Sequence, residues 1–120
     1  MELLAYLLTG VVILFHLYVV VIETVLFDKV GARVFRLSPE KAAIVKPAMS
    51  NQGCYNGFLV AALALGLLWP DPAIARAFLF YGLACVVVAG LWGGITVGKR
   101  ITILQSMPAA LALLAFWAAR

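Results

Sequence analysis

Charged residues are scarce in this sequence: they make up 12% of its 120 residues, whereas 66% are hydrophobic. A soluble domain is about a quarter charged and about half apolar, and the mean hydropathy here is +1.11. The shortage argues against a soluble globular domain, because the apolar residues fall into four long blocks separated by short charged segments. About 20 helical residues cross a bilayer core of about 30 Å. We therefore expect one transmembrane domain over residues 1–120.

Cysteine and histidine are rare as well. Cys54 and Cys85 are the two cysteines, they form no CxxC pair, and both lie in apolar runs, so we interpret them as reduced, buried side chains. His16 is the single histidine and has no companion at metal-ligand spacing, which argues against a zinc or haem site. We expect no metal and no cofactor. The sequence has no nucleophile motif, and whether the chain is an enzyme stays open.

Acidic residues are outnumbered by basic ones, five to nine, which gives a formal net charge of +4. The basic residues stand at the ends of the apolar runs, not on one face with interleaved aromatic residues, so no nucleic-acid partner is expected. Positions at the ends of spans are typical of residues that anchor and orient a membrane protein. The expected partner is the lipid bilayer, and self-association into a homo-oligomer stays open.

The apolar blocks predict an all-α fold, namely an antiparallel bundle of four transmembrane helices. The first block is too long for a signal peptide and begins with Glu2, not with a basic residue, so we expect a retained helix. The turn before the third span is marked by Pro70-Asp71-Pro72. The expected spans cover residues of about 3–27, 53–69, 77–97 and 101–119.

The long polar connection between the first two spans holds a second helix signal. Ser38-Pro39-Glu40 has the composition of a helix start, with a capping serine, a proline at the first position and an acid in the first turn. We expect a short amphipathic helix there, lying on the membrane surface and ended or kinked by Pro47.

The distribution of basic residues predicts the orientation. Segments 28–50 and 98–100 together carry seven basic residues, whereas the opposite side carries Arg76 and Arg120. This excess predicts that both segments are cytoplasmic and that the N- and C-termini lie outside the bacterial inner (plasma) membrane. Trp69 and Trp117 then end spans at the outer interface, as aromatic anchors often do.

Polar residues inside the spans are the most informative feature, because an ionisable group at a helix centre costs about 2.5 kcal/mol or more on insertion. The topology places polar residues from all four helices in one layer near the cytoplasmic face. His16 lies seven residues before Glu23, on nearly the same helix face. We predict that Glu23 faces the interior and meets Gln52, Asn56 or Gln105. The candidate ligand-binding residues are Glu23, His16, Gln52, Tyr55, Asn56, Thr96 and Gln105.

Glycines recur every four residues in two of the spans. Gly90, Gly94 and Gly98 follow this spacing in the third, and Gly53 and Gly57 follow it in the second. Small residues at this spacing let helix backbones approach closely. We expect the second and third helices to pack through these glycine faces.

One segment resembles a known family. The run Asn51-Gln52-Gly53-Cys54-Tyr55-Asn56-Gly57-Phe58-Leu59, with His16 and Glu23 upstream and with Gly93-Gly94-Ile95-Thr96 and Gln105-Ser106-Met107-Pro108-Ala109 downstream, is similar to a bacterial and fungal membrane family, domain of unknown function 1304. The resemblance covers essentially the whole chain. It implies a compact four-helix membrane protein and points to the same polar residues, but it implies no activity. Cys54 stands where the family's motif leads us to expect an aliphatic residue.

Three functions compete on this basis. The first is binding or transport of a small amphipathic molecule in a polar pocket near the cytoplasmic face, with Glu23 exchanging a proton for it. The second is a membrane-embedded enzyme of isomerase or hydratase type, with Glu23 and His16 as acid–base groups on a lipophilic substrate. The third is a structural subunit whose amides and hydroxyls only hold helices together. We favour the first.

The predicted orientation can be tested by labelling engineered cysteines in intact cells with a membrane-impermeant maleimide. Ala73→Cys should react, because the turn before the third span is expected outside, whereas Ser38→Cys should be shielded in the cytoplasm. Labelling of the Ser38→Cys variant with protection of the Ala73→Cys variant would show that the orientation is the opposite of the predicted one.

Overall fold

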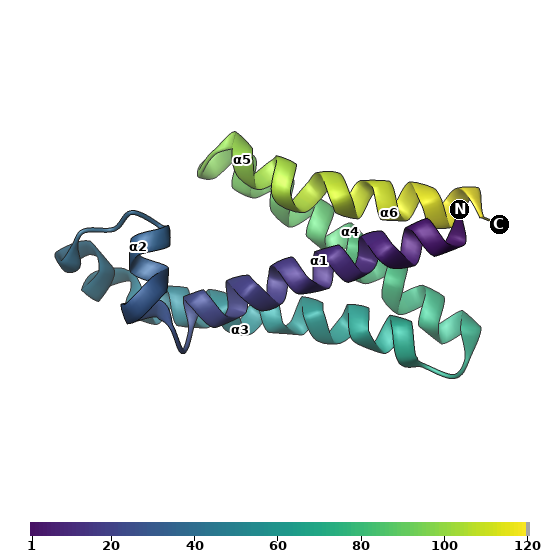
Figure 1. Ribbon diagram of the computed structural model, residues 1–120, viewed down its shortest axis with the longest axis horizontal. Helices are drawn as coiled ribbons and strands as arrows, with labels where there is room; N and C mark the ends of the chain where they lie inside the picture. Colours follow the sequence, from purple (N-terminus) through teal and green to yellow (C-terminus); the bar gives the residue numbers. More distant parts are fainter. Residues whose placement is uncertain (120) are drawn as a thin grey trace. The chain divides into compact units, whose positions relative to one another are not determined.

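The chain is helical throughout the part that the structure describes. The computed structural model describes residues 1–119, in which helices are the only regular elements, so the predicted all-α class is confirmed. Along the chain these elements are α1 (Glu2–Glu23), the π-helix η1 (Phe27–Gly31), α2 (Ala32–Val34), α3 (Pro39–Leu68), α4 (Pro72–Thr96), α5 (Lys99–Ile101), the π-helix η2 (Thr102–Ser106) and α6 (Met107–Ala118) (Figure 1).

Contacts group the described residues into two compact units. One consists of residues 1–14 and the chain from residue 61 onward, and the other consists of residues 15–60. Helices α1 and α3 each contribute to both units, whereas α4 and α6 belong to the first alone. The second unit contains Glu23 and the basic connection that follows it.

Three helical segments in the described chain are long and apolar enough to cross a membrane, namely α1, α4 and the run Lys99–Ala118. The second expected span, 53–69, forms the last part of α3, which is not one of the three. The reason is the polar content of that helix around Gln52 and Asn56. The structure therefore supports three span-length helices directly, and a fourth span remains a prediction.

The bounds of the span-length helices correct the sequence-based ones. The first helix ends at Glu23, not near residue 27, because the backbone widens there from α-helical hydrogen bonding toward the π-helix η1. The third helix begins at Pro72, five residues earlier than expected, because Asp71 caps it. The Asp71 carboxylate accepts hydrogen bonds from the backbone N–H groups of Ala73 and Ile74, at 2.9 and 3.0 Å. The last helical run begins at Lys99, two residues before the predicted start.

The connection between the first two spans is more helical than predicted. Ser38 does mark a helix start, since its hydroxyl oxygen accepts a hydrogen bond from the Lys41 backbone N–H at 3.3 Å. The helix is α3 itself, however, and not a separate helix on the membrane surface. It continues through Pro47 to Leu68. Pro47 removes one backbone hydrogen bond to Ala43, and because Ala43 is exposed, water can satisfy the carbonyl that is left over.

In the second unit the chain folds back tightly after α1. Gly31 approaches the last turn of α1 so closely that a Cβ atom there would lie 1.9 Å from the Ile22 carbonyl oxygen and 3.0 Å from the Phe27 ring. Phe27 is buried. The close approach requires glycine at position 31, and it places the basic residues that follow beside the end of α1.

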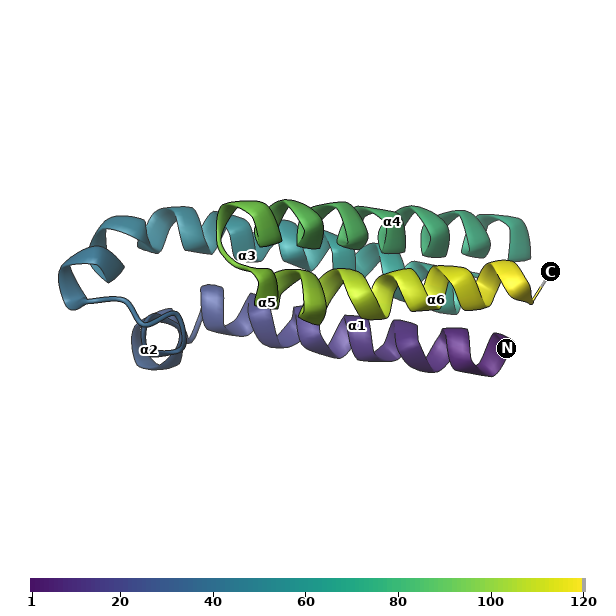
Figure 2. The ribbon, with the colours of Figure 1, turned by 90° about the horizontal axis from the view of Figure 1, so that it is seen from above.

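In the first unit α4 packs against η2 and α6 through its glycines, and Figure 2 shows α4 and α6 side by side. A Cβ atom on Gly90 would lie 2.3 Å from the Ser106 hydroxyl oxygen, and one on Gly94 would lie 1.8 Å from the Thr102 hydroxyl oxygen. The same hydroxyls bind the α4 backbone: Ser106 donates to the Val87 carbonyl at 2.8 Å and Thr102 to the Gly90 carbonyl at 3.0 Å. This pairing is antiparallel.

The predicted packing of the second and third helices through these glycines is therefore wrong. The glycine face of α4 meets the last helix, because the short turn at Gly98 brings small hydroxyl residues directly opposite it. Helices α3 and α4 do pack in the first unit, but through other glycines. A Cβ atom on Gly66 would lie 2.6 Å from Leu79, and one on Gly82 would lie 2.8 Å from Leu63.

Replacing Gly90 by alanine should lower the thermal unfolding midpoint of the detergent-solubilised protein. The added methyl group meets Ser106 and would separate two helices, a change that costs about 1–3 kcal/mol in packed cores. Gly10→Ala is the matched control, because it adds the same group to a helix at a position with no atom within 4 Å. Equal midpoints for the two variants would contradict the packing described here.

Candidate functional site

The candidate site is built around Glu23, the last residue of α1. Glu23 is 1% exposed, and an ionised carboxylate is among the groups that are most costly to bury. A carboxylate in such a place needs hydrogen-bond donors to compensate for lost hydration. Because α1 ends at Glu23, this residue is not a full turn inside the first helix, as a span reaching residue 27 would have made it.

Two amide side chains from α3 supply the donors. The Gln52 Nε2 atom donates to Glu23 Oε1 at 2.6 Å, and the Asn56 Nδ2 atom donates to Glu23 Oε2 at 2.8 Å. Residues four apart lie on the same face of a helix, so one turn of α3 reaches both carboxylate oxygens. The expectation that Glu23 meets Gln52 or Asn56 is confirmed.

Gly53 allows α3 to come close enough for these bonds. A Cβ atom at this position would lie 2.6 Å from the Thr24 methyl carbon and 3.1 Å from the Glu23 Cβ atom. Thr24 itself is held by its hydroxyl group, which donates to the Val20 carbonyl at 2.6 Å. The glycine between the two amide-bearing turns therefore sets the distance between α1 and α3.

The cluster of Glu23, Gln52 and Asn56, here called the carboxylate cluster, is rich in acceptors. Each Glu23 oxygen has one amide donor and retains a further lone pair, and the amide oxygens of Gln52 and Asn56 add two acceptors. Gln52 is exposed and Asn56 is half-buried. An acceptor-rich, acidic group of this kind suits a cation that carries N–H donors.

Two other predicted site residues lie in the same unit, and their surroundings differ. His16 is 1% exposed, and its ring lies edge-on to Phe15 with the ring centroids 5.6 Å apart. Tyr55 is 61% exposed and packs edge-on against Phe58, also at 5.6 Å. Tyr55 thus occupies the outer face of α3, whereas its neighbours Gln52 and Asn56 turn toward Glu23.

Thr96 and Gln105 belong to the first unit. Thr96 is exposed and donates its hydroxyl hydrogen bond to the Trp92 carbonyl of its own helix, at 2.9 Å. Gln105 is half-buried in η2, where its Cβ atom lies against the α4 backbone near Gly90. The layer that was expected to unite them with Glu23 stays a prediction.

Sequence reasoning missed two contributions to this region. Gly53 was expected to pack against the third helix and instead adjoins Glu23 and Thr24. Asp28 and Lys46 form an ion pair just beyond the carboxylate cluster, and no pairing was predicted for them. The sequence offers no signal for this pairing beyond the opposite charges of the two residues, because a turn separates Glu23 from the π-helix η1 that contains Asp28.

The donor set of the described residues does not favour a metal. No group of three or more His, Cys, Asp or Glu side chains within residues 1–119 is arranged to hold an ion. Each Glu23 oxygen already accepts a hydrogen bond from an amide N–H group.

Comparison with known proteins places these residues in a family. The chain is similar to YpaA of Lactococcus lactis subsp. lactis (strain IL1403), a protein described as uncharacterized, with 29% identity over 119 residues that cover 95% of this chain and 97% of the relative. No solved structure matches the chain. A family model matches residues 10–117, which include the carboxylate cluster and both π-helices. The chain therefore belongs to the family described as protein of unknown function (DUF1304).

Proposed function

We propose that this chain is an integral membrane protein of four spans, and that its carboxylate cluster binds the polar head of a small amphipathic molecule carrying N–H donors. The proposal has two parts, insertion into the membrane and binding at the cluster. Different observations support them, and they can fail separately.

Membrane insertion is supported by the outer surfaces of the span-length helices. Leu14 on α1 is 69% exposed, Val88 on α4 is 66% exposed and Leu114 on α6 is 61% exposed. Only about a third of each span, or less, is buried within the protein (33%, 28% and 28%). In water, helices this apolar would bury most of their surface. Hydrocarbon chains of a bilayer would cover these side chains without cost.

The apolar part of α3 is the candidate for the fourth span. Gly53–Leu68 extends for about 24 Å at 1.5 Å per residue, somewhat less than the bilayer core of about 30 Å. The polar residues at its start are less costly to insert than a hydropathy sum implies, because the amides of Gln52 and Asn56 are hydrogen-bonded to Glu23. With the basic segments in the cytoplasm and both termini outside, the cluster lies near the cytoplasmic face.

A single observation carries the binding proposal, namely that both oxygens of a buried carboxylate are held by amides from one turn of another helix. This arrangement fixes the position of the negative charge before any ligand arrives. Binding then requires little reordering of the site, which favours affinity. The exposed Gln52 amide is the side from which a ligand approaches, and its head group would bind the amide oxygens with the Glu23 charge behind them.

The arrangement also stabilises the fold, and this contribution is measurable. Asn56→Leu should lower the thermal unfolding midpoint in mild detergent, because Glu23 Oε2 loses its donor and an unsatisfied buried acceptor costs about 1–3 kcal/mol. Asn51→Leu is the matched control on the same helix, since Asn51 is exposed. An unchanged midpoint for Asn56→Leu would show that the bond to Glu23 contributes nothing to stability.

Binding can be tested with two short amphiphiles that remain monomeric, n-hexylammonium and n-hexyltrimethylammonium. The first should bind to the detergent-solubilised protein in titration calorimetry. The second should bind at least about tenfold more weakly, because it has the same charge and chain but no N–H donor, and hydrogen bonds to charged groups contribute about 1.5–3 kcal/mol.

The matched pair of variants is Glu23→Gln and Glu2→Gln, which remove the same charge from opposite ends of α1. Glu23→Gln should abolish the preference for n-hexylammonium, whereas Glu2→Gln should leave it unchanged. Equal affinity for the two amphiphiles, or a preference that survives in Glu23→Gln, would leave the cluster with a structural role alone.

A further inference from the structure

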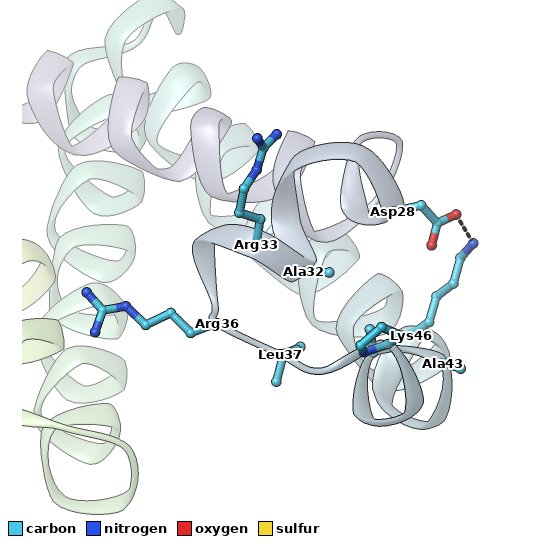
Figure 3. A pocket seen from close by; sticks show the side chains of 9 residues that line it. Asp28, Ala32, Arg33, Arg36, Leu37, Ala43 and Lys46 are labelled. Atoms are coloured by element: carbon cyan, nitrogen blue, oxygen red, sulfur yellow. Dashed lines mark hydrogen bonds and ion pairs between the residues drawn. The ribbon is translucent and has the colours of Figure 1, made fainter.

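A second candidate site lies in the connection that follows α1. Residues of the second unit line an open pocket with a volume of about 780 Å³. This volume is within the usual size range of small-molecule sites. Figure 3 shows the segment of α2 and the first turns of α3 around it. The lining residues are Asp28, Ala32, Arg33, Arg36, Leu37, Pro39, Ala42, Ala43 and Lys46.

The charge of this pocket is positive. Three of its lining residues are basic and one is acidic. Asp28 is paired with Lys46, and in Figure 3 the two arginine side chains extend away from that pair. Arg33 is steadied by a hydrogen bond from its Nη2 atom to the Lys29 carbonyl, at 3.0 Å. The guanidinium groups of Arg33 and Arg36 are therefore not neutralised by Asp28.

The backbone at Arg36 provides an independent observation. Helix α2 ends in a Schellman motif, in which Leu37 N–H donates to the Ala32 carbonyl at 2.9 Å and Arg36 N–H donates to the Arg33 carbonyl at 3.0 Å. The motif needs a left-handed residue and usually has glycine there. Arg36 takes that position with a φ angle of 54°, the only positive φ at a non-glycine residue in the described chain. An arginine in this conformation carries a strain of about 1–2 kcal/mol.

We propose that this pocket binds the head group of an anionic phospholipid, with the guanidinium groups of Arg33 and Arg36 as the donors that attract it. Guanidinium groups bind phosphate oxygens through paired hydrogen bonds. Apart from the Asp28–Lys46 pair, the other lining residues are apolar, which suits the glycerol carbons next to a lipid phosphate better than a free, fully hydrated anion.

The position of the pocket along the chain supports a lipid ligand. Helix α1 is long and apolar enough to cross a membrane and ends at Glu23, so a segment that begins at Asp28 lies at head-group depth if α1 crosses the membrane. This inference rests on the proposed membrane insertion. It does not rest on ligand binding at the carboxylate cluster. Basic clusters just beyond a membrane span on the cytoplasmic side are a common mode of anionic lipid recognition.

The test is a titration of the full chain in a neutral detergent with short-chain dihexanoylphosphatidylglycerol, against dihexanoylphosphatidylcholine. The phosphatidylglycerol should bind and the zwitterionic lipid should bind at least about tenfold more weakly. Arg36→Gly should weaken phosphatidylglycerol binding about tenfold or more, while its thermal midpoint stays the same or rises, because glycine adopts the left-handed conformation without strain.

Two further variants make the result specific to the pocket. Arg33→Gln should weaken phosphatidylglycerol binding as Arg36→Gly does. If Arg36→Gly alters the fold, the affinity of Arg33→Gln is the test of the pocket. Lys41→Gln removes the same charge from the same segment without lining the pocket. In about 0.3 M salt it should change affinity by no more than about twofold, because exposed charges beyond contact distance are screened.

The opposite outcomes are equally distinct. An equal loss in Lys41→Gln and Arg36→Gly would show diffuse attraction and overturn the pocket. Binding of glycerol 3-phosphate or inorganic phosphate as tightly as the lipid would identify a free-anion site and overturn the lipid assignment. Glu23→Gln should retain full phosphatidylglycerol binding, so failure at the carboxylate cluster and failure at this pocket are told apart.

Discussion

Glu23 is a buried carboxylate at the end of an apolar helix. The hydrogen bonds that compensate for its lost hydration determine how α1 and α3 pack in the second unit. A charge in that position is tolerated only where donors are held against it. The amides of Gln52 and Asn56 meet this need, and they do so only because Gly53, between them, allows α3 to touch α1. The hydrogen bonds thus set the register of α3 against α1. Beyond the carboxylate cluster, Asp28 forms an ion pair with Lys46.

The first unit uses a related solution without a charge. Gly90 and Gly94 bring the α4 backbone into contact with the last helical run, where the hydroxyl groups of Ser106 and Thr102 donate to α4 carbonyls. Apolar packing between helices is a weak driving force in hydrocarbon, so close backbone approach and buried hydrogen bonds are the interactions on which membrane helices depend. Both hydroxyl groups belong to η2, at its first and last residues.

The two proposed sites have opposite charge and lie close together in the sequence. The carboxylate cluster at Glu23 is acceptor-rich and is the proposed site for an N–H cation, whereas the basic pocket that begins at Asp28 is donor-rich and is the proposed site for a phosphate. Each has a constraint that pure helix formation does not require, a buried charge in one and a strained arginine in the other. Such costs are commonly found at functional positions. Together they describe a protein whose polar chemistry is concentrated beside one end of α1.

The sequence alone was sufficient for the all-α class and for the family, and it named Gln52 and Asn56 among three candidate partners of Glu23. Apolar blocks of span length leave few alternatives to helices, and the four-residue spacing of Gln52 and Asn56 places two amides on one helical face. Helix ends were less accurate, because hydropathy does not register capping by Asp71 or the widening of the backbone after Glu23.

The choice of packing partners was made by the tertiary structure. Gly90 and Gly53 both signalled close contact, but glycine spacing does not name the neighbour, and each meets a helix other than the one expected. The pocket around Arg36 could likewise not be predicted from the sequence, since it arises where one left-handed residue turns the chain between α2 and α3. Periodicity along a helix is a local property and can be read from the sequence. Which faces meet depends on turns and on long-range sterics, which only the folded chain determines.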